Sequence, residues 1–174
     1  MRVCLLMCLL CRTFHLVRAI YQYVFFIVDH ATKMCWMYPL KTRESKYILA
    51  HFSTFVNEVL PSLSIHLRHF HSDGGAELVA ADVLFFLHKS GFTTSHSPHD
   101  TPQMNSIAER WVRSLKEKVL CMLLGSSLPV SFWWLVMECA AYLLNRLPTK
   151  SVRGYMSPYE CVYGAAPDLK WIRI

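Results

Sequence analysis

The sequence predicts an α/β domain with a mixed sheet, a β-hairpin and flanking helices. Three observations favour this fold class. The 174 residues are enough for one domain with a sizeable core. A hydrophobic content of 53% with 17% charged residues is typical of a globular protein rather than a disordered one. Strand-like and helix-like patterns also alternate along the chain, as they do in mixed α/β domains.

The first two elements expected are strands joined by a short turn. Residues 21–29 are aromatic and β-branched and end at Asp29, and residues 34–40 form a second run of the same kind. The four residues between them, 30–33, are enough for a tight connection. We therefore predict a hairpin, with Pro39 at its end or on an edge strand.

Residues 43–96 predict a helix, a strand, a second helix and a short strand. Apolar residues recur at three- and four-residue spacing in 43–60, and Pro61 is the expected stop. A third strand is expected at 63–71. The second helix is expected at 77–89, with Gly91 as its cap, and a short strand at 92–96.

The rest of the chain predicts helices at 105–124, at 129–146 and at 157–163. The second of these has an apolar face that includes Phe132, Trp133 and Val136. In the third, Ser157 is a suitable N-cap and Pro158 suits the first helical position. The tryptophans could be read as a base-stacking platform, but their helical spacing and apolar neighbours favour core packing.

Residues 1–20 form an atypical N-terminal segment. A single basic residue and a short apolar stretch are similar to a signal peptide, but the stretch is too short for a membrane span and no small-residue cleavage site follows. We expect instead a buried strand, or unrelated sequence at a truncated or frame-shifted end. The seven cysteines form no paired framework, which favours reduced thiols in a nuclear or cytoplasmic setting over secretion.

Two acids are the main candidates for chemistry. Asp73 follows the strand at 63–71, and Glu109 lies where a turn gives way to a basic helix, with thirty-five residues between the two. Carboxylates at a strand end and on a helix wall can together hold a divalent cation. Asp73 could instead be only a turn former, and Glu109 only an acid favoured by the helix dipole.

The basic side chains that follow Glu109 suit a polyanion. Lys and Arg exceed Asp and Glu by 18 to 12, a net charge of +6. Arg110, Arg113 and Lys116 could grip DNA phosphates. The alternative is a solvated face in which Glu117 pairs with Arg113. Zinc binding by the histidines at 66, 69 and 71 is a weaker interpretation than ordinary solvent-facing or core histidines.

The chain resembles the integrase catalytic core of a copia-type retrotransposon polyprotein, over about residues 21–174. The order and spacing of several short stretches carry the resemblance: Phe26-Ile-Val-Asp29, Trp36-Met-Tyr38, His71-Ser-Asp-Gly-Gly75 with Glu77, Thr101-Pro-Gln103 with Asn105, Ala108-Glu-Arg110, Ser131-Phe-Trp133, Ala141-Tyr-Leu-Leu-Asn-Arg146 and Ser157-Pro-Tyr-Glu160.

The resemblance implies a ribonuclease H-like fold and metal-dependent DNA strand transfer. It makes Asp73 and Glu109 the second and third of three acids that hold Mg²⁺ or Mn²⁺, and it places Gln103 and Asn105 near the DNA ends. The first acid belongs on the opening strand, and residues 1–28 contain no Asp or Glu. The opening strand is therefore degenerate or replaced, and the nearby Asp29 matches a different Asp of the family.

The resemblance also implies partners. They are DNA, as retroelement ends and target, and a homo-oligomer, with no membrane and no small-molecule substrate. We expect weak or absent catalysis, since two of the three acids remain. The alternatives are a non-catalytic nucleic-acid-binding or assembly module and, more remotely, a small secreted protein.

Overall fold

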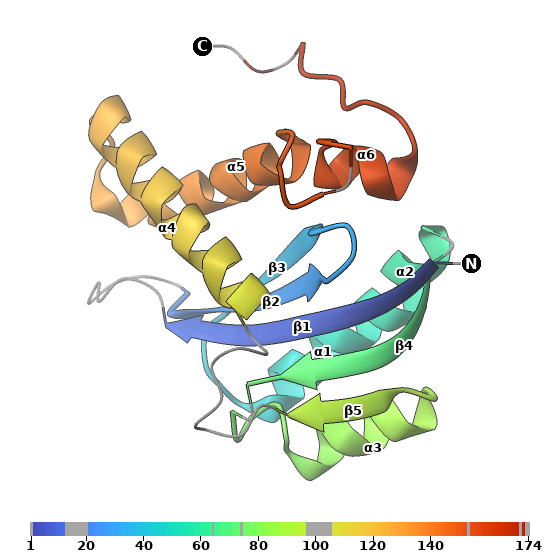
Figure 1. Cartoon of the computed structure of the whole chain (residues 1–174). Coiled ribbons are helices and arrows are strands. Elements are labelled where there is room, and N and C mark those ends of the chain that lie inside the picture. The colour runs from blue at the N-terminus through green and yellow to red at the C-terminus, as the bar shows by residue number, and fades with distance from the viewer. Residues whose placement is uncertain are drawn as a thin grey trace.

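The sheet at the centre of the molecule has five strands. A computed structural model describes residues 2–12, 21–63, 65–73, 75–96, 106–152, 154–170 and 172. The strands lie in the order β3-β2-β1-β4-β5 (Figure 1). Their bounds are β1 (Arg2–Arg12), β2 (Tyr23–Asp29), β3 (Cys35–Leu40), β4 (Ile65–Ser72) and β5 (Thr93–His96).

The predicted hairpin is confirmed. β2 and β3 pair antiparallel from Tyr23 with Leu40 to Val28 with Cys35. Lys33 in the turn has a positive φ of 62°, a conformation that is uncommon for a residue other than glycine. Pro39 lies within β3, which is tolerated because β3 is an edge strand.

The N-terminal segment supplies the middle strand. β1 pairs antiparallel with β2 and parallel with β4, with one register shift between Cys4 and Leu5. The sequence of this strand lacks an acid, yet its backbone occupies the position that joins the hairpin to β4 and β5. The place of an opening strand is therefore filled by a strand whose sequence contains no acid.

One face of the sheet is covered by the helices that follow β3 and β4. They are α1 (Ser45–Thr54), the π-helical turn η1 (Phe55–Val59), α2 (Leu60–Ser62) and α3 (Ala81–Lys89). Phe25, Phe52 and Phe70 are fully buried between them and the sheet. The prediction that Pro61 stops the first helix was wrong. The helix runs on to Ser62, because the wider π-turn before it accommodates a residue without an N–H. The second helix begins later than predicted, since residues 76–79 form a turn and bend.

The opposite face is covered by the C-terminal helices (Figure 1). They are α4 (Ser106–Ser126), the 3₁₀ turn η3 (Val130–Phe132) and α5 (Trp133–Arg146). The last helix, α6 (Pro158–Tyr163), packs against α5, and its Val162 belongs to the first core. Trp133 is buried in this second core, which confirms its interpretation as a core residue, while Trp111 and Trp134 pack against the core and remain partly exposed. The expected inward position of Phe132 was wrong: it lies in η3 and is 43% exposed.

Two polar contacts fix this layer. The Nδ2 of Asn145 in α5 donates to the carbonyl of Cys35 at 2.8 Å, and the amide of Cys35 donates back to Oδ1 at 3.0 Å. At α6, the Ser157 hydroxyl accepts from the Glu160 amide at 3.1 Å, as predicted for an N-cap. Within the part of the chain that the structure covers, every helix is too short or too polar to cross a bilayer.

Candidate functional site

Asp73 follows β4 directly and is partly buried. Its Oδ1 accepts a hydrogen bond from the Gly75 amide at 3.2 Å. A side chain at Gly75 would crowd this carboxylate, because a Cβ there would lie 3.3 Å from Oδ1. Asp73 thus stabilises the turn after β4 through Oδ1, and its Oδ2 takes no part in that hydrogen bond.

An ion pair lies beside Asp73. Arg43 donates to Oε1 of Glu77 from Nε at 3.0 Å and from Nη2 at 2.5 Å. The Glu77 hydrogen bond raises the pKa of Arg43, and the charge of Asp73 raises it further. This cation partly neutralises the acids at the end of β4. Sequence reasoning missed Arg43, since only the packing of α1 near α3 brings position 43 close to position 77.

Glu109 lies in the first turn of α4 and is exposed. A carboxylate at this end of a helix is favoured by the helix dipole. α4 contacts β1, and β1 is hydrogen-bonded to β4. Figure 1 shows the first turn of α4 over β1, near the carboxyl end of β4. The two elements that carry Asp73 and Glu109 are therefore connected through β1.

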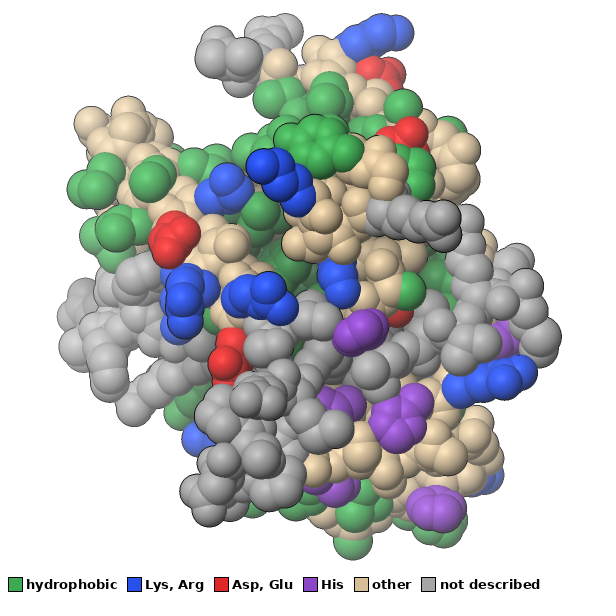
Figure 2. Space-filling model, viewed as in Figure 1, with side chains coloured by type: hydrophobic (Ala, Val, Ile, Leu, Met, Phe, Trp, Pro, Cys, Tyr) green, Lys and Arg blue, Asp and Glu red, His purple; other side chains and the backbone are tan. Residues whose placement is uncertain are grey.

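The cations predicted to bind DNA lie on α4. Arg110, Arg113 and Lys116 are exposed, and Figure 2 shows Lys and Arg side chains gathered over α4 and the elements beside it. Among the described residues, ion pairs join Arg43 to Glu77 and Lys46 to Glu44. Pairing of Arg113 with Glu117, which would indicate a merely solvated face, is thus not observed there. Gln103 and Asn105 lie outside the described residues.

A histidine network occupies β4 and β5. His69 Nδ1 and Nε2 lie 2.8 Å from Thr93 Oγ1 and 2.7 Å from Ser95 Oγ, and His71 Nδ1 lies 2.8 Å from the same serine oxygen. His69 and His71 share a strand face, as predicted. Burial lowers the pKa of His71, and the neighbouring His69 and His96 lower it further. Serine and threonine hydroxyls thus occupy these ring nitrogens, which favours a hydrogen-bonding role over zinc ligation.

The strand register identifies the residue of β1 that lies beside Asp73. β4 pairs Ser72 with Cys8, so the next residue of β4, Asp73, is level with Leu9. Leu9 is also the β2 partner of Phe26, which belongs to the core under α4 and α5. Cross-strand partners share a face, so position 9 lies on the α4 side of the sheet. A leucine there cannot hold a cation.

The described residues therefore do not complete a two-ion centre. No three His, Cys, Asp or Glu side chains among them are arranged to hold a metal. Asp73 and Glu109 supply oxygen ligands of the type that Mg²⁺ and Mn²⁺ prefer, but two carboxylates are fewer than such a centre needs. The groups that this geometry presents to a ligand are the cations of α4, namely Arg110, Arg113 and Lys116, and the carboxylates of Asp73 and Glu109.

Comparison with known proteins finds relatives of one kind, retrovirus-related Pol polyproteins from transposons. The chain is 34% identical over 154 residues, 88% of its length, to the retrovirus-related Pol polyprotein from transposon RE1 of Arabidopsis thaliana. It is 32% identical over 128 residues, 74% of its length, to that from transposon TNT 1-94 of Nicotiana tabacum. It spans about 10% of the length of these relatives. No family model matches the chain.

Solved structures show the same fold. The catalytic core domain of BIV integrase superposes with a TM-score of 0.66 at 17% identity, covering 92% of this chain and 93% of that one. The HTLV-2 integrase catalytic core domain in complex with magnesium, in a trimeric form, also gives 0.66, at 15% identity, covering 91% and 95%. The predicted ribonuclease H-like fold is confirmed.

Proposed function

Because the chain is a homologue of copia-type, retrovirus-related Pol polyproteins and has the fold of an integrase catalytic core, we propose that it binds DNA through the basic face of α4. We further propose that it retains little or no strand-transfer activity. The observation that carries the first part is the set of exposed cations on α4, next to the acid of its first turn.

Electrostatics support binding of this kind. Arg113 and Lys116 are three residues apart on one helix, so their side chains extend from neighbouring turns. Exposed cations that contact phosphates release counterions on binding, which gives an affinity that falls steeply with salt. The overall charge of +6 adds a longer-range attraction for a polyanion.

The expectation of weak catalysis follows from position 9. Two-ion catalysis places attacking and leaving oxygens against ions that the protein holds in a fixed geometry. With leucine at the β1 position level with Asp73, Asp73 and Glu109 would hold such ions poorly. If ions bind at all, the chemistry they supply is activation of water or of a DNA 3′-hydroxyl, and Mg²⁺ or Mn²⁺ are the ions that these oxygens suit.

The DNA-binding proposal predicts a specific salt dependence. Replacing both Arg113 and Lys116 by Ala should weaken binding to a labelled DNA duplex. It should also reduce the slope of log K against log salt by about 1.8, since each lost phosphate contact removes about 0.9. Fluorescence anisotropy at several NaCl concentrations measures this slope.

The matched control removes two cations from the other layer of the molecule. Lys46 of α1 and Lys89 of α3 are both exposed, and their double replacement by Ala should leave the slope within about 0.5 of the wild-type value, because only distant charges change. Equal slopes for the two double variants, or binding that does not respond to salt, would contradict the proposed interface.

A further inference from the structure

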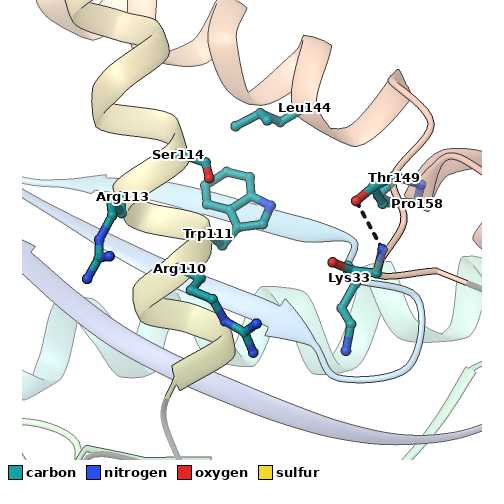
Figure 3. Close-up of a pocket in the computed structure, with 9 residues that line it drawn as sticks. Lys33, Arg110, Trp111, Arg113, Ser114, Leu144, Thr149 and Pro158 are labelled. Atoms are coloured by element: carbon teal, nitrogen blue, oxygen red, sulfur yellow. Dashed lines mark hydrogen bonds between the residues drawn. The ribbon is translucent and has the colours of Figure 1, made fainter.

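A cavity of about 510 Å³ opens beside α4. It lies between α4, the turn that joins β2 to β3, the end of α5 and the segment that leads to α6 (Figure 3). Its volume is within the range of about 300–1,000 Å³ typical of ligand sites. The residues that determine its chemistry are Lys33, Arg110, Trp111, Ser114, Leu144 and Thr149. The described residues that line it include no acid.

One rim of the cavity is cationic. Figure 3 shows Lys33 and Arg110 extending in the same direction from the two sides of the cavity. Burial lowers the pKa of Lys33 and the charge of Arg110 lowers it further, while the buried Asp29 raises it. The ammonium of Lys33 also donates to the carbonyl of His30. A phosphate placed beside Lys33 and Arg110 would gain charge-assisted hydrogen bonds from both cations. Lys33 is also held in its left-handed conformation, a kind of local strain that is concentrated at functional sites.

The wall of the cavity is aromatic and apolar. The indole of Trp111 projects into the space in Figure 3, and its ring lies 5.8 Å, centroid to centroid, from that of Phe26. The core thus holds the indole in place with one part of its surface still accessible. Leu144 adds apolar surface, and the hydroxyls of Ser114 and Thr149 provide hydrogen-bonding groups at its margin.

We propose that this cavity receives one unpaired nucleotide of a DNA strand, with a phosphate at Lys33 and Arg110 and the base against Trp111. A cationic rim next to a flat apolar wall matches a ligand that has an anion at one end and a ring at the other. A cavity of this volume has room for one nucleotide and excludes a DNA duplex. The inference deepens the proposed function, on which it rests, by naming the part of the DNA that this side of α4 binds.

The test compares two single-stranded 12-mers that differ in one feature. One carries all its bases, and the other has abasic sites throughout, so both present the same phosphates. The wild-type chain should bind the intact strand about 5- to 150-fold more tightly, the range that stacking of one base supports. Trp111→Leu should remove this difference, and Trp111→Phe should keep most of it.

Two further measurements do not depend on the fold of the Trp111 variants. A strand with one 5-iodouracil should photocross-link to the peptide that contains Trp111. Lys33→Met, at the partly exposed rim, should lower the affinity for both strands alike, because the proposed role of the ammonium is to contact a phosphate and not a base.

The outcomes separate the two proposals. Equal affinities of the wild-type chain for the intact and abasic strands, or cross-links confined to other peptides, would overturn the nucleotide site and leave DNA binding by α4 standing. Failure of both strands and of duplex DNA to bind would overturn both proposals.

Discussion

The contact between Asn145 and Cys35 gives the sharpest test of how the second layer is attached. Asn145 is 6% exposed, and its amide group makes two hydrogen bonds to the backbone of Cys35, 110 positions away. Through these bonds α5 is joined to the edge strand β3. Asn145→Leu keeps a side chain of similar size but removes both hydrogen bonds.

The expected loss of stability can be worked from this geometry. Each hydrogen bond contributes about 1 kcal/mol net, and buried peptide groups that lose a partner cost about 1–3 kcal/mol more. We therefore expect a decrease of about 2–5 kcal/mol in the free energy of unfolding. In urea this corresponds to a midpoint lower by about 1–2.5 M, for an m-value of about 2 kcal/mol/M.

The control is Asn57→Leu, because Asn57 is exposed and its amide donates to the hydroxyl of Ser53, four residues away. Its free energy of unfolding should change by less than about 0.5 kcal/mol, as for an ordinary surface substitution. Unfolding followed by circular dichroism measures both variants. Asn145→Leu with a midpoint equal to that of Asn57→Leu would refute the view that this side chain holds α5 to β3.

Two further predictions concern the site. Leu9→Asp should create a Mn²⁺ site with Asp73, seen as tighter Mn²⁺ binding by calorimetry; unchanged affinity would contradict the position read from the register. The lowered pKa of His71 means that the unfolded chain takes up its proton first, so stability should fall as the pH drops below about 6.5. His71→Gln should make the fall in Tm between pH 7.5 and 5.5 less steep. Part of the fall should remain, because the pKa values of His30 and His51 are also lowered. A profile of Tm against pH that is unchanged in His71→Gln would refute this role of His71.

Local sequence patterns predicted the hairpin and most helices because their signals lie within each element. The aromatic run before Asp29 and the cap at Ser157 are examples. The errors arose where two local signals compete. Pro61 normally stops a helix, but the π-turn before it lets the chain continue. Phe132 fits the periodicity of α5, yet it lies in the 3₁₀ turn that precedes it.

Contacts between distant positions could not be predicted in this way. The pair of Arg43 with Glu77 depends on how α1 packs near α3. The significance of position 9 appears only once β1 and β4 are in register. The cavity is formed by a turn, two helices and a loop, none of which carries a recognisable motif for it. The sequence alone identified Asp73 and Glu109 as candidates. The residues that surround them could be identified only from the folded structure.

The most direct test of the central proposal is a strand-transfer assay with Mn²⁺ on the wild-type chain and on Asp73→Asn. We predict DNA binding by both proteins and no strand-transfer product from the wild-type chain above the level of Asp73→Asn. Product formed by the wild-type chain and abolished by Asp73→Asn would show that Asp73 and Glu109 suffice for catalysis, and would contradict the view that a leucine at position 9 has silenced the site.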